Sequence, residues 1–281
     1  MNIQEVILLS ADYLESKGID QARLQAEHLV ATMLGMKRLD LYMNFDRPVN
    51  EEELAACREA LKRRGQGEPL CYIEGTVDFY GCTFEVNPHV LIPRPETEIL
   101  VDKIVSKCKK IALKGKKLWD ICSGSGCIGI SLKKEFPDLD VTLVDISDEA
   151  IQVAKMNAQK NDVEVETLCG DLFAPLHNQQ ADFIVCNPPY ISKKEFNELS
   201  SEVKNWEPHQ ALLAGDTGLE FYSKIAEEIK KYLKPGGYAW FELGAGQGNA
   251  VYELFKRHQL NSLCVEKDWA GHDRFFSLEN E

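Results

Sequence analysis

The sequence predicts an α/β protein whose main part is a doubly wound sheet of seven strands, preceded by a small all-helical domain and a β-hairpin. Two observations lead to this prediction. From about Glu96 onward, short apolar strand patterns alternate with helical patterns, which is typical of a parallel sheet with right-handed crossovers and helices on both faces. The stretch of roughly 70 residues at the start carries apolar residues at helical spacing alone.

Three helices are expected in the first domain, which we place at residues 1–70. The first covers Asn2–Lys17 and the second Asp20–Leu34, with Asp20 as the candidate N-cap. The third begins after Asn50 with three glutamates and ends with three basic residues before Gly65. Acids at the start of a helix and bases at its end complement the helix dipole.

The pattern changes after this helical domain. Between Cys71 and Val90, β-branched and aromatic residues surround several glycines, which predicts a β-hairpin with its turn near Tyr80–Gly81. We expect residues 71–90 to link the helical domain to the larger domain at residues 91–281. The strands expected in that larger domain are Lys117–Ile121, Asp140–Val144, Glu164–Leu168, Asp182–Cys186, Gly237–Leu243, Ser262–Glu266 and Arg274–Leu278.

Helices are expected between the first five of these strands. The short connection at Lys267–Asp273 indicates that the last two strands pair antiparallel at an edge of the sheet.

Composition excludes several classes of protein. The 281 residues contain no apolar run long enough to cross a membrane, and the N-terminus lacks the pattern of a signal peptide, so the cytoplasm is the expected location. The nine cysteines are odd in number and form no Cys-x-x-Cys pair, which argues against a disulfide framework and a zinc cluster. A net charge of −13 argues against direct binding of nucleic acid, which favours a basic face.

A glycine-rich segment follows the first predicted strand of the sheet. It contains Cys122, Ser123, Gly124, Ser125 and Gly126 and leads into a helix. This glycine spacing is typical of a Rossmann-like turn that approaches a nucleotide closely. Asp145 ends the next strand about twenty residues later, where an acid can accept hydrogen bonds from two ribose hydroxyls.

The turn alone fits both NAD and S-adenosylmethionine. Asp120, just before the turn, favours S-adenosylmethionine, because its carboxylate would repel a pyrophosphate but attract an ammonium or sulfonium group; alternatively, Asp120 only caps the turn. After the third strand, Asp171 is placed to accept an adenine amino group and Leu172 to pack against the ring. An Asx-type turn at Asp171 is the other interpretation.

The most specific motif is Asn187-Pro188-Pro189-Tyr190, directly after the strand Asp182–Cys186. An amide or aromatic amine nitrogen is a poor nucleophile, so both of its N–H groups must be held with the lone pair facing the methyl donor. The Asn187 side-chain oxygen and the Pro188 carbonyl oxygen can accept these N–H groups. The prolines stiffen the segment, and Tyr190 provides an aromatic wall.

With these motifs, the chain resembles the release factor glutamine methyltransferases (the HemK/PrmC family) over its whole length. The general class of S-adenosylmethionine-dependent enzymes is indicated by Asp120, the glycine turn, Asp145 and the tetrapeptide. The narrower family is indicated by the segments Leu91–Glu98, Glu207-Pro208, Ala211-Leu212 and Gly215–Leu219.

The resemblance implies a class I methyltransferase fold and S-adenosylmethionine as the cofactor, with no metal. It implies that residues 122–126, Asp145, Leu172 and Asn187 line the cofactor and that residues 187–190 hold the substrate amide. The implied substrate is the glutamine of the Gly-Gly-Gln loop of peptide chain release factors, methylated on N5. The helical domain would help to dock this partner, and a monomer is expected.

Some points stay open at the level of sequence. Many relatives carry glycine where this chain has Cys122, so the turn is expected either to shift slightly or to start with an ordinary strand conformation. The roles of Arg94 and of Glu242, which ends another strand, are not assigned. Alternative functions are glutamine methylation of a ribosomal protein, amino-methylation of a nucleic acid base, an NAD-dependent oxidoreductase, and a binding module without activity.

Overall fold

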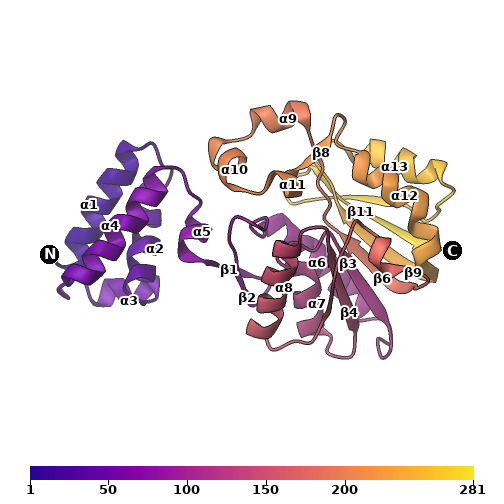
Figure 1. Ribbon diagram of the computed structural model, residues 1–281, viewed down its shortest axis with the longest axis horizontal. Helices are drawn as coiled ribbons and strands as arrows, with labels where there is room; N and C mark the ends of the chain where they lie inside the picture. Colours follow the sequence, from indigo (N-terminus) through magenta and orange to yellow (C-terminus); the bar gives the residue numbers. More distant parts are fainter. The chain divides into compact units, whose positions relative to one another are not determined.

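The computed structural model describes residues 1–281 (Figure 1). The chain divides into two compact units. The first comprises Met1–Gly75 and the short segment Ser200–Trp206. The second comprises Thr76–Leu199 and Glu207–Glu281. The predicted α/β fold with a helical N-terminal part is confirmed.

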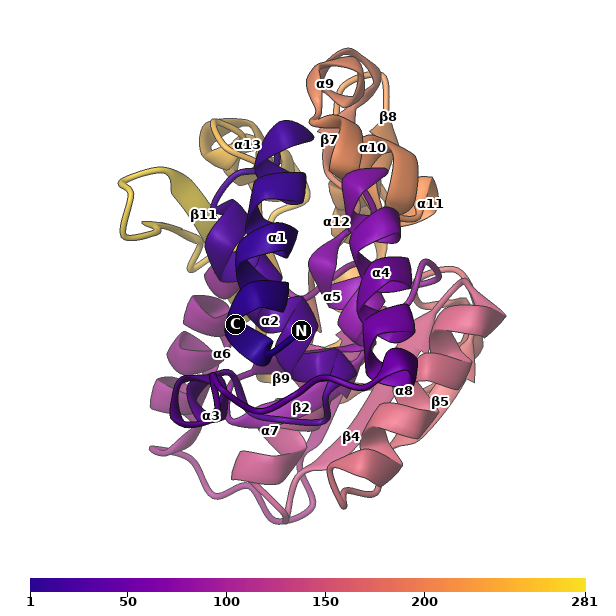
Figure 2. The same cartoon turned by 90° about the vertical axis from the view of Figure 1, so that its left-hand side faces the viewer.

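The first unit is entirely helical, apart from an isolated bridge between Asn2 and Pro48. Helices α1, α2 and α4 run side by side in Figure 2 and bury their apolar faces against one another. Asn2 and Asn50 each form a capping box with the glutamate three residues later, which fixes where α1 and α4 begin. The helices of this unit are α1 (Ile3–Ser16), α2 (Ala22–Met33), α3 (Arg38–Met43), α4 (Glu51–Gly65), α5 (Leu70–Glu74) and α10 (Ser201–Trp206).

Three details of this unit differ from the sequence-based expectation. The N-cap of α2 is Gln21, which has left-handed backbone angles and makes no side-chain cap, so Asp20 does not cap this helix. The six-residue helix α3 was not predicted. Residues 71–74 belong to α5 rather than to the hairpin. Both helices are too short to show a clear apolar period in the sequence.

The second unit begins with the predicted hairpin. Its strands are β1 (Thr76–Phe79) and β2 (Cys82–Glu85), and the two turn residues Tyr80 and Gly81 both have positive φ. Two-residue hairpin turns need this conformation because it matches the twist of the strands.

A seven-stranded sheet forms the centre of the second unit, with the strand order β10-β11-β9-β6-β3-β4-β5. The five strands from β9 to β5 are parallel, whereas β10 and β11 pair antiparallel at one edge as expected. The chain reverses its direction of winding between β3 and β6, which creates a topological switch point. The strands are β3 (Lys117–Ile121), β4 (Asp140–Asp145), β5 (Glu166–Cys169), β6 (Ala181–Cys186), β9 (Leu233–Glu242), β10 (Cys264–Lys267) and β11 (Asp273–Asn280).

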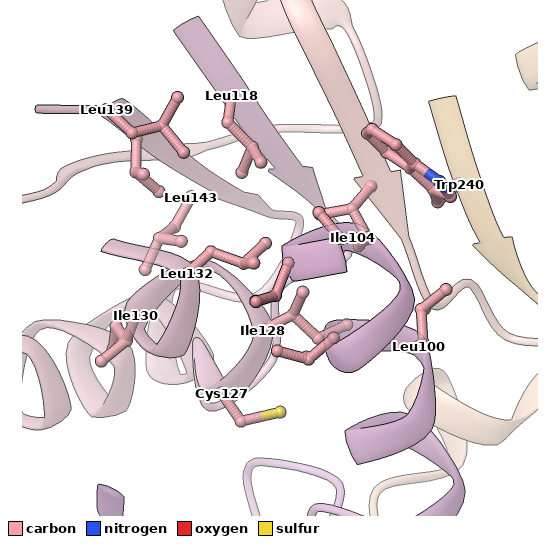
Figure 3. Packing of buried hydrophobic residues seen from close by; sticks show 14 of the residues in the cluster. Leu100, Ile104, Leu118, Cys127, Ile128, Ile130, Leu132, Leu139, Leu143 and Trp240 are labelled. Atoms are coloured by element: carbon pink, nitrogen blue, oxygen red, sulfur yellow. The ribbon is translucent and has the colours of Figure 1, made fainter. Parts of the chain in front are cut away.

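Helices cover both faces of this sheet. On one face, residues of α6 and α7 pack on strand residues such as Leu118 and Leu143 (Figure 3). Helix α8 and the hairpin contribute to the same cluster. On the other face, α12 and α13 pack on alternating residues of the same strands, including Trp119 and Phe241. The helices are α6 (Pro95–Cys108), α7 (Cys127–Glu135), α8 (Asp148–Lys160), α12 (Glu220–Tyr232) and α13 (Gly248–Arg257).

One expected crossover helix is absent. Only the 3₁₀ turn η1 (Ala174–Leu176) lies between β5 and β6, where an α-helix was predicted. The connection from β6 to α12 holds only short elements. Besides α10 of the first unit, they are β7 (Ile191–Ser192), α9 (Lys193–Glu198), α11 (His209–Leu212) and β8 (Leu213–Gly215). These segments are too short for their periodicity to be visible in the sequence.

Asn157 of α8 and Asn161, the C-cap of this helix, hold the hairpin. Asn157 exchanges hydrogen bonds with the backbone of Glu85, at 2.6 and 3.1 Å, and Asn161 does the same with Thr83, at 3.3 and 3.0 Å. Both asparagines are buried. The hairpin is thereby attached to the helix that follows β4.

No helix combines the length and hydrophobicity needed to cross a bilayer. The nine cysteines are free, and no three His, Cys, Asp or Glu side chains are grouped so that they could hold a metal ion.

Candidate active site

A cavity of about 390 Å³ lies in the second unit, at the carboxyl ends of β3, β4, β5 and β6. This is the edge where doubly wound sheets bind their ligands, and the size suits a small organic molecule. The residues predicted to contact a cofactor line this cavity, with the exception of Gly126; they are Cys122, Ser123, Gly124, Ser125, Asp145, Asp171, Leu172 and Asn187.

The glycine turn between β3 and α7 is tightly wound. Cys122, Gly124 and Gly126 all have φ between 52° and 79°. Cys122 therefore adopts the left-handed conformation that a glycine would adopt, rather than an ordinary strand conformation. The turn is held from outside, because Asn157 Nδ2 donates to the Ser125 carbonyl oxygen at 2.9 Å and Ser123 N donates to the Val144 carbonyl oxygen at 3.0 Å.

Gly126 does not line the cavity; its lack of a side chain allows α7 to pack closely on β4. A Cβ at this position would lie 2.8 Å from Ile130 Cδ1 and 3.0 Å from Leu143 Cδ1. At Gly129, within α7, a Cβ would lie 2.4 Å from Leu143 Cδ2. These two glycines let the start of α7 approach β4 closely, which keeps the preceding turn against the cavity.

Asp120 is fully buried at the end of β3 and does not itself line the cavity. Its Oδ2 accepts the backbone N–H of Gly129 at 2.8 Å, while its Oδ1 has no hydrogen-bond partner. Burial raises the pKa of this carboxyl to about 7. The hydroxyl of Ser123, on the cavity wall, is also without a partner. Buried polar groups are normally hydrogen-bonded, so the free hydroxyl of Ser123 is available to a polar group of a ligand, and the buried carboxyl of Asp120 adds an acidic group behind the turn.

Asp145 ends β4 and is hydrogen-bonded to both the glycine turn and the start of the connection to α8. Its Oδ2 accepts the Gly124 N–H at 2.8 Å and its Oδ1 accepts the Ser147 N–H at 3.0 Å. Burial raises the pKa of Asp145. An ionised carboxylate has about four acceptor sites, so both oxygens can still accept hydrogen bonds from a pair of hydroxyls on a ligand.

The part of the wall beyond Asp145 is largely apolar. Leu172 is buried and has a left-handed backbone, and Ile146 is 52% exposed although it lies on the cavity wall. Asp171 forms an ion pair with Lys224 at 3.6 Å. These side chains can flank a flat aromatic ring. Ile146 is a wall residue that no motif in the sequence singles out.

The Asn-Pro-Pro-Tyr segment leaves the sheet directly after β6. Asn187 and Pro189 line the cavity, whereas Pro188 and Tyr190 do not. The Tyr190 hydroxyl lies 3.4 Å from Glu242 Oε1, and the Tyr190 carbonyl oxygen accepts a hydrogen bond from Gln247 Nε2 at 2.9 Å. Burial and the neighbouring Glu242 raise the pKa of Tyr190.

Two further chain segments contribute to the cavity wall. The first runs from Pro88 to Thr97, up to and into the start of α6, and the second runs from Pro208 to Ala211, at α11. Arg94 of the first segment pairs with the buried Glu207, next to the second. The wall residues contributed by these segments are Pro88, His89, Val90, Leu91, Pro93, Arg94, Thr97, Pro208, Gln210 and Ala211. In the sequence, only the motif segments Leu91–Glu98, Glu207-Pro208 and Ala211-Leu212 pointed to this region.

Two thiols meet beside the glycine turn. Cys186 ends β6 next to Ile121 of β3, and its fully buried side chain contacts that of Cys122. Burial and the neighbouring thiol raise the pKa of Cys186 far above its usual value. The Cys186 thiol is therefore protonated at neutral pH and acts as a small apolar group in the core.

Comparison with known families gives two matches to this chain. A model described as the PrmC N-terminal domain matches residues 5–75, and one described as the methyltransferase small domain matches residues 95–203. The chain is 42% identical to the release factor glutamine methyltransferase of Geobacter sulfurreducens over 97% of this chain and 94% of that protein. It is 41% identical to the enzyme of the same name from Chlamydia trachomatis, over 99% and 94%.

Among solved structures, the catalytic domain of hMettl16 in complex with the MAT2A 3′UTR hairpin 1 is similar in fold. The TM-score is 0.58 at 15% sequence identity, and the match covers 90% of this chain and 91% of that one. At this level of identity the similarity concerns the fold alone.

Proposed function

We infer the reaction from one premise: this chain belongs to the release factor glutamine methyltransferase family. It is an S-adenosylmethionine-dependent enzyme that methylates a glutamine side chain of a release factor. We propose that the acceptor is the N5 nitrogen of the glutamine in a Gly-Gly-Gln loop. The observation that carries this proposal is that Asn187 and Pro189 line the same cavity as the glycine turn and Asp145.

The residues around the cavity fit the cofactor. Bound there, S-adenosylmethionine supplies an electrophilic methyl group. We propose that Asp145 accepts the ribose hydroxyls and that the free hydroxyl of Ser123, on the cavity wall, bonds the amino acid part of the cofactor. The buried carboxyl of Asp120, behind the turn, attracts the cationic groups of that part through its charge. Leu172 packs on the adenine ring and Asp171 accepts its amino group.

The glycine turn, residues 122–126, provides the backbone that approaches the cofactor. A carboxylate with a free lone pair at this turn attracts cationic groups in a water-poor environment, where the attraction is stronger than in bulk water. The same carboxylate would disfavour the pyrophosphate of NAD, so the site is suited to S-adenosylmethionine.

The acceptor amide is held by residues 187–190. The side-chain oxygen of Asn187 accepts one N–H of the amide and the Pro188 carbonyl oxygen accepts the other. The amide plane is then fixed with its nitrogen lone pair toward the methyl donor. Pro188 and Pro189 are buried and rigid, so these acceptors need little reorganisation as positive charge develops on the nitrogen. The ring of Tyr190 supports the flat group from one side.

The chain does not have to supply a strong base. The amide nitrogen becomes cationic as the methyl group arrives, and it can release its proton to water afterwards. Most of the rate gain then comes from alignment, for which about 7–11 kcal/mol is available in favourable cases.

The direct partner in this proposal is the release factor protein, docked with help from the helical first unit. The enzyme acts as a monomer in the cytoplasm and does not bind nucleic acid directly. The net charge of −13 supports a protein substrate over a polyanion.

The test is mass spectrometry of candidate substrates after incubation with the full chain and S-adenosylmethionine. We expect a single added methyl group on the glutamine of the Gly-Gly-Gln peptide of a release factor, formed about a hundredfold more slowly with Asn187→Ala. Parallel reactions contain ribosomal proteins, tRNA and duplex DNA. Methylation of a ribosomal protein or a nucleic acid, with an unmodified release factor, would overturn the proposed substrate.

A further inference from the structure

Glu242 occupies a position beside the catalytic tetrapeptide that the proposed function does not use. It is the last residue of β9, which pairs in parallel with β6 so that Phe241 lies opposite Cys186. Glu242 and Asn187 therefore follow neighbouring positions at the same edge of the sheet. The side chain of Glu242 is only 1% exposed.

The carboxylate of Glu242 connects two segments that are far apart in the chain. Its Oε2 accepts the hydroxyl of Thr97 at 2.6 Å, and its Oε1 lies 3.4 Å from the hydroxyl of Tyr190. Thr97 lines the cavity from α6 and Tyr190 ends the tetrapeptide. The longer bond is of the kind that tightens when a substrate closes the site.

The position of Glu242 is itself fixed from a third element. The fully buried Tyr222 of α12 donates its hydroxyl to the Glu242 carbonyl oxygen at 2.8 Å. The backbone and the side chain of Glu242 are thus both held, which leaves the carboxylate little freedom to move away from Tyr190.

The fold alone does not explain an acid at this place. The side-chain hydrogen-bond donors to Glu242 are hydroxyls, and no salt bridge holds its carboxylate. Arg274, which donates to the Leu243 carbonyl oxygen, acts on Glu242 through its charge only, and burial outweighs it so that the pKa of Glu242 is raised. Burying a carboxylate without a bonded cation reduces stability relative to a neutral side chain of the same shape. Residues that reduce stability in this way are found where function requires them.

Tyr190 is also held at its main chain by the connection that follows Glu242. Gln247 Nε2 donates to the Tyr190 carbonyl oxygen at 2.9 Å, and Gln247 Oε1 accepts the Gly244 N–H at 3.0 Å. A Cβ at Gly218 would lie 2.6 Å from the Tyr190 carbonyl oxygen, so the neighbouring loop also packs closely on it. The ring and the backbone of Tyr190 are therefore anchored to one element, the start of the β9–α13 connection.

We propose that Glu242 is a positioning residue for methyl transfer, which fixes the ring of Tyr190 through its hydroxyl while sharing its carboxylate with Thr97. This role rests on the proposed function, because it concerns how the tetrapeptide holds the acceptor amide. A carboxylate can accept both hydroxyls at once. The amide of a glutamine offers one acceptor oxygen and one NH₂ donor. In Glu242→Gln, the hydroxyls of Thr97 and Tyr190 therefore cannot both donate to separate side-chain oxygens as they do to the carboxylate.

The test compares Glu242→Gln, Tyr190→Phe and the double variant in the full chain. We expect each single variant to lower kcat by about tenfold with the KM for release factor and the Kd for S-adenosylmethionine within about threefold, because the lost contact matters mainly in the transition state. The double variant should be no slower than the singles, since both remove one interaction. A roughly hundredfold loss in the double variant would show independent roles and overturn the proposal.

The melting temperature separates positioning from simple support of the fold. Glu242→Gln should melt at the same or a higher temperature than the wild type, since it removes a buried charge. A lower melting temperature with unchanged kcat in the still folded enzyme would mean that Glu242 serves only stability.

Thr97 provides a second, gentler probe. Thr97→Val keeps the shape of the side chain and loses the hydrogen-bond donor, so it should lower kcat. Thr97→Ser keeps the hydroxyl, so its kcat should be close to that of the wild type.

The matched control for Glu242→Gln is Glu266→Gln, the same chemical change at a partly exposed residue of β10 that pairs with Lys103. It should leave kcat unchanged. Full activity of Thr97→Val and Glu242→Gln on a release factor that the wild type methylates would overturn the inference alone. A wild type that does not methylate release factor would instead overturn the proposed function.

Discussion

The carboxylate of Asp120 accepts the backbone N–H of Gly129 at 2.8 Å through one oxygen, and its second oxygen meets no donor. A buried acid with one empty acceptor site holds its proton more tightly than in water. Its pKa is accordingly raised by burial from the ordinary 3.8 to about 7. Two measurable consequences follow from this arrangement, one for stability and one for cofactor binding.

The stability of the cofactor-free enzyme should depend on the protonation of Asp120. Between pH 3.8 and about 7 the folded chain keeps a proton that the unfolded chain has released. The contribution of Asp120 to the free energy of unfolding is therefore complete below this window and is lost as the pH rises through about 7. Urea unfolding of the wild type and Asp120→Asn between pH 5 and 8 measures this, and the variant should show a smaller decline. Equal pH slopes in the two proteins would contradict the assignment.

Cofactor binding should shift the same proton. A cationic group near the turn favours the ionised form of Asp120, so binding of S-adenosylmethionine below pH 7 should release a proton and affinity should rise toward pH 7. Calorimetry in two buffers of different ionisation enthalpy reports the number of protons released. The release should disappear in Asp120→Asn, and persistence of the full release in this variant would assign it to another group.

Asp145 should affect cofactor affinity more than turnover at saturation. Its two oxygens already hold the N–H groups of Gly124 and Ser147, so it both shapes the turn and offers acceptor sites to the ribose. Asp145→Ala should weaken S-adenosylmethionine binding by tenfold or more, since roughly 1.4 kcal/mol corresponds to tenfold and hydrogen bonds to charged groups contribute about 1.5–3 kcal/mol. The affinity of Asp145→Asn for S-adenosylmethionine should lie between those of the wild type and Asp145→Ala. Calorimetry would remove Asp145 from the site if the affinity of Asp145→Ala were unchanged.

The strands of the sheet could be predicted from the sequence because their apolar runs alternate with long helical segments of clear period. The predicted strand at Lys117–Ile121 matches β3, and the antiparallel edge of β10 and β11 is confirmed. The six-residue helix α3 was not predicted, and an α-helix was wrongly predicted where only the three-residue turn η1 lies, because such short segments show no clear period. The cavity residues that follow strands were also predictable, since parallel strands present their carboxyl ends at one edge.

Other parts of the site depend on contacts that no local pattern reveals. Thr97 and Glu242 are 145 residues apart in the chain, yet their side chains lie 2.6 Å apart. Arg94 and Glu207 are similarly distant and form an ion pair. The sequence marked all four residues as belonging to motifs or strand ends, but their pairing depends on how the segment before α6 and the region around α11 pack on the sheet.

The cysteines should differ strongly in their reactivity. Cys169 and Cys264 are exposed, whereas five of the nine are buried, including Cys186. The raised pKa of Cys186 leaves almost no thiolate at neutral pH. A short pulse of iodoacetamide followed by mass spectrometry should label Cys169 and Cys264 and leave Cys186 unmodified. S-adenosylhomocysteine should protect Cys122, which lines the cavity; equal labelling of Cys122 with and without this ligand would place the ligand elsewhere.

Asn187 should act on the transfer step and hardly on cofactor affinity. Its side chain is half-buried on the cavity wall, after the last residue of β6, where its oxygen can accept an N–H of the acceptor amide. Asn187→Ala should reduce kcat by about a hundredfold or more, as removal of one oriented polar group does in other active sites. The Kd for S-adenosylmethionine should stay within a few-fold. The matched control is Asn249→Ala on the exposed side of α13, which should leave kcat unchanged. If Asn187→Ala turned over release factor at a rate close to that of Asn249→Ala, the acceptor amide would have to be held by other groups.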